Sequence, residues 1–268
     1  MKVELNNCVY NIEQIYGASE APTLIFLHYF GGSARTWQLV IEQLNGAAQC
    51  VAVDMRGFGE SKATNNSYTL PDYAQDIAEL VQKLGLTSYI LVGHSMGGKV
   101  ALLHAAQQPK GLQMLVLIAP SPPTPEPMTE TERSQMLETH GSREAALQTI
   151  QKITAHPLPA VLLERAITDN LRSQTTAWQA WLEQGSRADI TSDLTSLELP
   201  IVVIVGTADP VIPPDMVERE IVGRFKAVQL ERIAEVGHLS PLEAPAQLAK
   251  IIGSVVRPPK ATSIGASS

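Results

Sequence analysis

A serine between two glycines is the feature of this sequence that points most directly to chemistry. The stretch GHSMG at residues 93–97 matches the pattern G-x-S-x-G, with an apolar run before it and a helical pattern after it. Where a strand turns sharply into a helix, this pattern displays the serine hydroxyl as a nucleophile. The glycines remove side chains that would crowd the strained turn. The sequence therefore predicts Ser95 as a nucleophile.

The same stretch also comes close to a phosphate-binding loop. Gly93, Gly98 and Lys99 fit the pattern G-x-x-x-x-G-K-[S/T]. The next residue is Val100, which has no hydroxyl for a magnesium ion, so this interpretation is disfavoured. It would require magnesium-dependent binding of ATP or GTP. Taken alone, the stretch also fits a plain turn that joins a strand to a helix.

A serine nucleophile needs a base that takes its proton and an acid that orients the base. In proteins with this motif the order along the chain is serine, acid, histidine. Asp209 directly follows an apolar run, and His238 lies in a loop before the last helical pattern. Asp215 sits at a helix start, while Glu235 and Glu243 are too near His238 in sequence to face its ring. We therefore expect Asp209 as the acid and His238 as the base.

The oxyanion formed during such a reaction needs backbone N–H donors. One donor in this motif is the residue after the serine, here Met96. The second should come from the loop HYFGGS at residues 28–33, where Phe30 is the expected donor and Tyr29 the next candidate. A donor of this kind contributes about 3–4 kcal/mol to catalysis.

The elements that must position these residues alternate along the chain. Short apolar runs rich in Val, Ile and Leu occupy residues 23–28, 50–54, 89–93, 113–119 and 200–206. Helical patterns lie between them at 71–84, 95–107 and 214–222. This alternation predicts an α/β fold, a mostly parallel twisted sheet with helices on both faces. Residues 9–16 alternate apolar and polar side chains, which suits an antiparallel edge strand.

One long interval breaks this alternation. It opens with the proline-rich stretch 120–128 and continues with helical patterns at 130–139, 142–154, 158–170 and 175–184. We expect a helical cap at 121–190, inserted between two strands of a core formed by 1–120 and 191–257. An insertion at the carboxyl end of a strand lies over the ligand site of an open α/β sheet. The tail at 258–268 is expected to be disordered.

Composition limits the function classes. The formal net charge of −7 and the absence of a basic block disfavour nucleic acid as a partner. The N-terminus has no apolar signal core and no apolar run reaches the length of a membrane span, so we expect a cytoplasmic protein without a membrane partner. Two isolated cysteines make neither a disulfide framework nor a metal site.

Several stretches in the same order resemble the α/β-hydrolase superfamily over nearly the whole chain. They are FLHYFGGSARTW (26–37), VDMRGFGES (53–61), VGHSMGGKVAL (92–102), GTADPVIPP (206–214) and GHLSPLEAP (237–245). The resemblance implies an α/β-hydrolase fold with Ser95 as nucleophile, Asp209 as acid, His238 as base, a helical cap, and neither metal nor cofactor. Within the superfamily, the chain most resembles small bacterial esterases, enol-lactonases and cofactor-free haloperoxidases.

One position departs from that family pattern. Relatives commonly have His-Gly where this chain has His28 and Tyr29. The tyrosine hydroxyl would either add a third hydrogen bond to the oxyanion, as in some esterases of the superfamily, or pack under the cap. The sequence leaves both interpretations open.

We expect hydrolysis of a small carboxylic ester or lactone by a monomer or small homo-oligomer. A carbon–carbon bond hydrolase acting on a β-diketone-like substrate, or a perhydrolase, would use the same triad. A receptor that binds a ligand without turnover is a further alternative. Apolar residues of the helical segment would line an acyl pocket or bury themselves on the sheet: Leu162, Leu163, Ile167, Leu171, Trp178 and Trp181.

Overall fold

A computed structural model describes residues 1–5, 7–15, 17 and 20–256 of the chain. The expected disordered tail at 258–268 lies outside the described residues. Within them, nine strands form one sheet in the order β1-β2-β4-β3-β6-β7-β8-β9, with β5 paired to β2. The strands are β1 (Lys2–Leu5), β2 (Cys8–Ile15), β3 (Thr23–Leu27), β4 (Cys50–Val53), β5 (Lys62–Ala63), β6 (Tyr89–His94), β7 (Leu112–Ile118), β8 (Ile201–Gly206) and β9 (Val228–Ile233).

The sheet is parallel from β4 through β9 and antiparallel at β1 and β2. The predicted α/β class is thus confirmed, and the expected runs fall within one residue of the observed strands. The expectation of an edge strand at 9–16 was wrong in one respect. Strand β2 is antiparallel, but β1 pairs with its outer side, so β1 is the edge.

Helices cover both faces of the sheet. They are α1 (Gln38–Leu44), α2 (Leu70–Lys83), α3 (Met96–Ala106), α4 (Glu130–Glu138), α5 (Arg143–Ile153), α6 (Ala160–Arg172), α7 (Thr175–Glu183), α8 (Pro214–Val217), α9 (Ser240–Glu243) and α10 (Pro245–Val256). Helix α2 begins with a capping box, in which Thr69 and Asp72 each accept the other's backbone N–H. The sequence pattern missed α1.

The two faces of the sheet bury alternate residues of each strand, as the strand period of two requires. Ile25 and Leu27 pack into the layer that α2 and α3 cover, whereas Leu24 and Phe26 pack into the layer beneath α1 and α10. All four side chains are fully buried. A strand buried on both faces reads as a continuous apolar run, which is why these strands could be located from the sequence.

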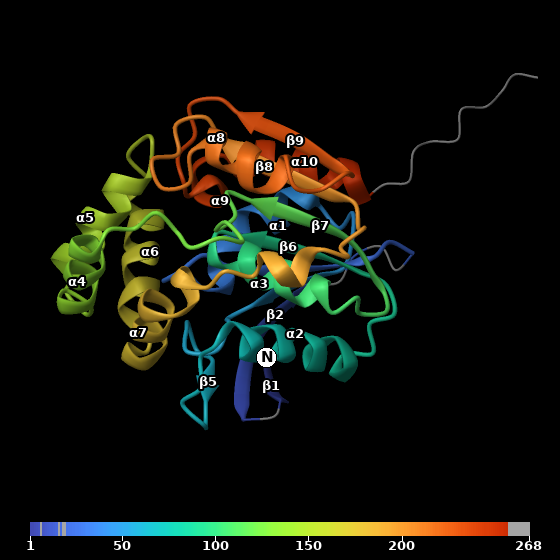
Figure 1. The fold of residues 1–268 in the computed structure, drawn as a ribbon, viewed down its shortest axis with the longest axis horizontal. Coiled ribbons are helices and arrows are strands. Elements are labelled where there is room, and N and C mark those ends of the chain that lie inside the picture. The colour runs from blue at the N-terminus through green and yellow to red at the C-terminus, as the bar shows by residue number, and fades with distance from the viewer. Residues whose placement is uncertain (6, 16, 18–19, 257–268) are drawn as a thin grey trace, which may run out of the picture.

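Helices α4 to α7 form one continuous helical segment between β7 and β8. In Figure 1 this segment lies beyond the side of the sheet toward which the arrowheads of β7 and β9 point. It contacts the core through buried polar groups: Asp169 on α6 accepts hydrogen bonds from Ser33 Oγ at 2.8 Å and from the Arg35 guanidinium. The N–H of Gln174, just before α7, donates to the Gly57 carbonyl at 2.8 Å.

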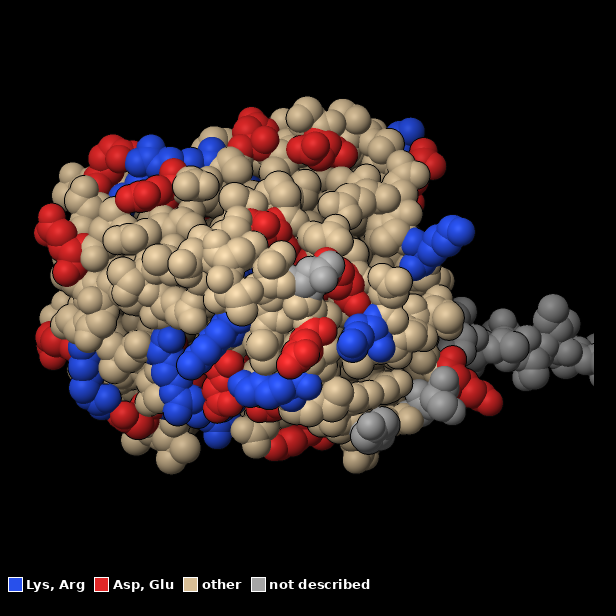
Figure 2. Space-filling model, turned by 90° about the horizontal axis from the view of Figure 1, so that it is seen from below, with Lys and Arg blue, Asp and Glu red and all other residues tan. Residues whose placement is uncertain are grey.

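On the face of the molecule that Figure 2 shows, positive and negative side chains are interspersed. On that face Lys and Arg side chains lie beside Asp and Glu side chains. Exposed pairs such as Lys2 with Glu60 contribute little to stability, because water screens them. Among the described residues, every helix is too short or too polar to cross a bilayer.

Candidate active site

Ser95 lies at the sharp turn between β6 and α3. Its φ of 51° and ψ of −115° place a non-glycine residue in a strained region of backbone conformation. The flanking glycines are needed for space, since a Cβ on Gly93 would lie 2.5 Å from the Gly97 carbonyl oxygen. A Cβ on Gly97 would lie 2.6 Å from the Leu27 carbonyl oxygen. Backbone therefore packs closely against both glycines that flank the strained residue.

The structure brings Ser95, His238 and Asp209 together. His238 Nε2 lies 3.0 Å from Ser95 Oγ, and His238 Nδ1 lies 2.8 Å from Asp209 Oδ2. A carboxylate only accepts hydrogen bonds, so Nδ1 carries the imidazole proton and Nε2 is left to accept from the serine hydroxyl. The three residues follow strands β6, β8 and β9, whose carboxyl ends meet at one edge of the sheet.

Asp209 is itself held in place by the turn that follows it. Its Oδ1 accepts from the N–H groups of Val211 at 2.8 Å and Ile212 at 2.9 Å, which leaves Oδ2 for His238. Asp209 is 5% exposed. A carboxylate fixed by two N–H groups on one oxygen presents the other oxygen to the imidazole in a single orientation.

His94 supports His238 from the strand side. Its Nε2 donates to the backbone carbonyl of His238 at 2.8 Å, and the two rings lie 5.2 Å apart. Burial, together with the nearby His238, holds the pKa of His94 well below its usual range. His94 is thus neutral at neutral pH and serves as a hydrogen-bond donor to the main chain of His238.

The loop after β3 orients the peptide between Tyr29 and Phe30. The Tyr29 carbonyl accepts from His28 Nδ1 at 2.7 Å and from the Gly32 N–H at 3.0 Å. His28 Nε2 in turn accepts from the Met55 N–H at 3.0 Å, so its proton is on Nδ1. In a trans peptide the N–H points opposite to the carbonyl. The Phe30 N–H therefore points away from His28.

The N–H groups at the start of α3 are the other available donors. Met96 and Gly97 are the first residues of this helix, so their N–H groups have no acceptor within it. Among the described residues, neither of these groups nor the Phe30 N–H donates a hydrogen bond. The positive end of the helix dipole lies at the same place and favours negative charge there.

The Tyr29 side chain packs between the core and the helical segment. It is 5% exposed and belongs to an apolar cluster with Ile150, Ile167 and Leu239. Its ring lies 5.3 Å from that of His94. Burial raises the pKa of the Tyr29 hydroxyl, with the charge of Asp169 adding to the effect. The ring thus packs against the helical segment, and a role of the hydroxyl in binding the oxyanion stays a prediction.

Aromatic side chains connect the loop after β3 to α7. The Phe30 ring lies 4.1 Å from that of Trp178 and 6.1 Å from that of Trp181. His140, in the turn after α4, stacks on Trp178 with the ring centroids 4.6 Å apart. Offset aromatic contacts of this kind stabilise by about 0.5–1.5 kcal/mol each beyond the area they bury.

Lys99 lies one helical turn after Ser95 and is fully buried. Its Nζ donates to the carbonyls of Thr124 at 3.1 Å and Ala188 at 2.6 Å, which stand at the two ends of the helical segment. Burial lowers the pKa of Lys99 to about 8, although Glu126 and nearby Asp189 oppose the shift. The lysine that a phosphate loop would use thus binds backbone carbonyls here.

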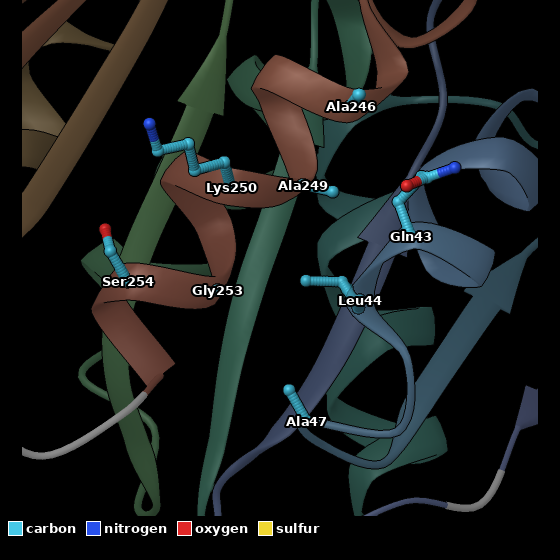
Figure 3. A pocket seen from close by; sticks show the side chains of 8 residues that line it. All are labelled: Gln43, Leu44, Ala47, Ala246, Ala249, Lys250, Gly253 and Ser254. Atoms are coloured by element: carbon cyan, nitrogen blue, oxygen red, sulfur yellow. The ribbon is translucent and has the colours of Figure 1, made fainter.

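The side chains of Ser95, Asp209 and His238 are nearly closed off from solvent. Ser95 is 7% exposed and His238 is 3% exposed. Two surface cavities lie elsewhere: a groove of about 340 Å³ between α1 and α10, shown in Figure 3, and one of about 250 Å³ near the ends of α5 and α6. Neither is lined by Ser95, Asp209 or His238. Across the described residues, no group of three His, Cys, Asp or Glu side chains gathers as metal ligands.

The chain belongs to the alpha/beta hydrolase family, whose model matches residues 24–251. It is similar to 3-oxoadipate enol-lactonase 1 of Acinetobacter baylyi, 22% identical over 247 residues that cover 91% of this chain and 92% of that protein. It is also similar to the sn-1-specific diacylglycerol lipase of Xenopus laevis, 26% identical over 237 residues that cover 83% and 75%.

A solved structure, an esterase from Exiguobacterium antarcticum, matches with a TM-score of 0.85 and 22% identity over 94% of this chain and 97% of that chain. The α/β-hydrolase fold expected from the motifs is thereby confirmed.

The sequence predicted the three side chains that the structure brings together, Ser95, Asp209 and His238, but not the residues that hold them. His28 and His94 stand beside predicted site residues, and a histidine at the end of an apolar strand was the available signal. Ile153 had no such signal. Its carbonyl accepts from the His238 N–H at 2.8 Å, a contact between segments far apart in the chain.

Proposed function

We propose that this chain is a serine hydrolase that cleaves carboxylic esters or lactones through an acyl-enzyme on Ser95. The observation that carries the proposal is the continuous hydrogen-bonded line from Ser95 Oγ through His238 to Asp209, with separations of 3.0 and 2.8 Å. A hydroxyl becomes an effective nucleophile when a base accepts its proton in this way.

In the first half of the reaction, Ser95 Oγ attacks the ester carbonyl while His238 Nε2 takes the hydroxyl proton. Asp209 keeps the proton on Nδ1 and stabilises the imidazolium that forms. His238 then gives its proton to the leaving alkoxide, and the acyl group remains on Ser95. In the second half, His238 takes a proton from water, the hydroxide attacks the acyl group, and Ser95 recovers its proton as the acid leaves.

We assign the oxyanion to the N–H groups of Phe30 and Met96, with Tyr29 as the next candidate donor. The orientation of the Tyr29 carbonyl toward His28 and the position of Met96 at a helix start support this assignment. Such donors stabilise the tetrahedral intermediate more than the ground state, because charge develops on the oxygen only there.

The residues around Ser95 and the known relatives support the proposed substrate class. Residues 121–190 act as a cap over a core formed by 1–120 and 191–257, and the aromatic side chains of Phe30, Trp178 and Trp181 offer an apolar wall for a small acyl group. The names of two relatives, an enol-lactonase and a lipase, support a carboxylic ester or lactone as the bond that is cleaved.

The test is hydrolysis of p-nitrophenyl acetate and butyrate in the presence of a chelator, with wild type beside Ser95→Ala. Ser121→Ala is the matched control, because Ser121 is a second buried serine whose N–H donates to the Ser95 carbonyl at 3.0 Å. We expect Ser95→Ala to lower kcat by at least about 10³-fold and Ser121→Ala to stay within about threefold of wild type.

Equal activity in wild type and Ser95→Ala would overturn the proposal. A wild type that is inert on esters and lactones but cleaves a β-diketone would show a carbon–carbon bond hydrolase with the same triad. A peracid product formed from acetate and hydrogen peroxide would show a perhydrolase. Tight ligand binding without turnover would show a receptor.

A further inference from the structure

The carboxylate of Glu243, at the end of α9, holds the backbone on both sides of His238. Its Oε2 accepts from the Gly237 N–H at 3.1 Å, and its Oε1 accepts from the Leu239 N–H at 3.0 Å. Glu243 is near His238 in sequence and does not face its ring. It acts on the main chain instead, which is the part that sets where the imidazole stands.

The same carboxylate also reaches the helical segment. Its Oε2 accepts from the N–H of Ala155, just after α5, at 2.8 Å. Two residues earlier, the Ile153 carbonyl accepts from the His238 N–H at 2.8 Å. The fit is close, since a Cβ on Gly237 would lie 2.5 Å from the Ala155 nitrogen. The histidine loop and the end of α5 are thus joined by hydrogen bonds in both directions.

A purely electrostatic role explains these contacts less well. Among the described residues, no Lys or Arg lies within ion-pair distance of Glu243. Its carboxylate, half-buried, is satisfied by three backbone N–H groups. Hydrogen bonds to an ionised acceptor are stronger than those between neutral groups, so this carboxylate is suited to fixing the loop.

We propose that Glu243 is a positioning residue that sets the backbone of His238 and couples the triad to docking of the helical segment at Ala155. The proposal rests on the function proposed above. When the segment moves away to admit substrate, Glu243 loses the Ala155 donor and His238 loses the Ile153 acceptor. The imidazole is then held in reacting geometry only when the segment is docked over the bound substrate.

The variants that test this are Glu243→Ala and Glu243→Gln, with Glu235→Ala as the matched control. Glu235 is an exposed acid in the same loop, and its side chain makes no hydrogen bond to any residue that the structure describes, although its backbone N–H donates to Thr207 Oγ1 at 3.0 Å. We expect Glu243→Ala to lower kcat about 10- to 100-fold with KM within about threefold. Glu243→Gln retains one acceptor oxygen and the side-chain volume, so its kcat should lie between those of wild type and Glu243→Ala.

Hydrogen exchange provides a second measurement that needs no turnover. In Glu243→Ala we expect faster exchange of the amides of Ala155, Gly237, His238 and Leu239, with β6 unchanged. A kcat for Glu243→Ala within twofold of wild type, or equal losses in Glu243→Ala and Glu235→Ala, would overturn the proposal.

Faster exchange throughout β6, with Glu243→Gln no more active than Glu243→Ala, would also overturn it, since general destabilisation would then explain the loss. If Ser95→Ala kept wild-type activity, the proposed function would fail. The exchange measurement would still decide whether Glu243 joins the two segments.

Discussion

Ser95 Oγ and His238 Nε2 lie 3.0 Å apart although 143 residues separate them in the chain. Their strands, β6 and β9, are not neighbours, because β7 and β8 lie between them in the sheet. The contact depends on loops at one edge of the sheet that are held by backbone hydrogen bonds on both sides. Substitutions that remove the hydrogen bonds of these loops should therefore lower kcat more than they lower the stability of the fold.

Asp209→Asn should separate geometry from chemistry. The N–H groups of Val211 and Ile212 need an acceptor, so the amide oxygen of the new side chain stays with them and its NH₂ faces His238 Nδ1. The ring must then carry its proton on Nε2, where it can no longer accept from Ser95. We expect kcat to fall about 10³- to 10⁴-fold.

The measurement is kcat on p-nitrophenyl acetate, with thermal unfolding as the control for the fold. The unfolding temperature should stay within a few degrees of wild type, because the side chain keeps its size. A loss of less than about tenfold in kcat would contradict the assigned tautomer.

Tyr29→Phe distinguishes packing from oxyanion binding. The Tyr29 ring packs with Ile150, Ile167 and Leu239, and its hydroxyl makes no hydrogen bond among the described residues. We expect the variant to retain kcat and KM on p-nitrophenyl acetate within about threefold, since the ring and its contacts remain. A loss of about 10²-fold in kcat is the cost of removing an oxyanion donor, and would show that the hydroxyl takes part.

Lys99→Met should change how stability depends on pH. The pKa of Lys99 in the folded chain, about 8, lies below its ordinary value of 10.5. Between these values the unfolded chain binds the proton and the folded chain does not, so the free energy of unfolding rises with pH. The neutral amine still has two N–H groups for the carbonyls of Thr124 and Ala188.

The measurement is urea unfolding of wild type and Lys99→Met at pH 7 and pH 10.5. The free energy of unfolding of wild type minus that of the variant should rise by about 2–3 kcal/mol across this window. Other titrating groups are common to both proteins and cancel in the difference. A difference that stays flat or falls would contradict a depressed pKa for this lysine.

The sequence contained enough to locate the buried strands and to predict that Ser95, Asp209 and His238 lie together. Apolar runs buried on both faces are distinctive, and Ser95 and Asp209 each come directly after or shortly after such a run. His238 follows the half-exposed strand β9, and its place was expected from the order along the chain and the loop before the last helix. The short strand β1 was not found, because four residues with mixed polarity carry no periodic signal. Its presence moved the sheet edge away from β2.

The hydrogen bonds that hold the site could not be predicted from the sequence pattern. Glu243 binds Ala155 across 88 residues, and His238 binds the Ile153 carbonyl through its own N–H. Backbone groups are present at every residue, so no residue type marks which ones will meet. Those pairings depend on how the helical segment docks, and that is decided by packing in three dimensions.

The most direct test of the central claim is covalent labelling with a fluorophosphonate, which reacts with an activated serine. After incubation, intact mass and peptide mapping would locate the label. We predict one phosphonyl group per chain, on the peptide that contains Ser95, absent in Ser95→Ala and formed more slowly in Asp209→Asn. A wild-type protein that hydrolyses esters yet carries no label, or carries it on another residue, would contradict Ser95 as the nucleophile.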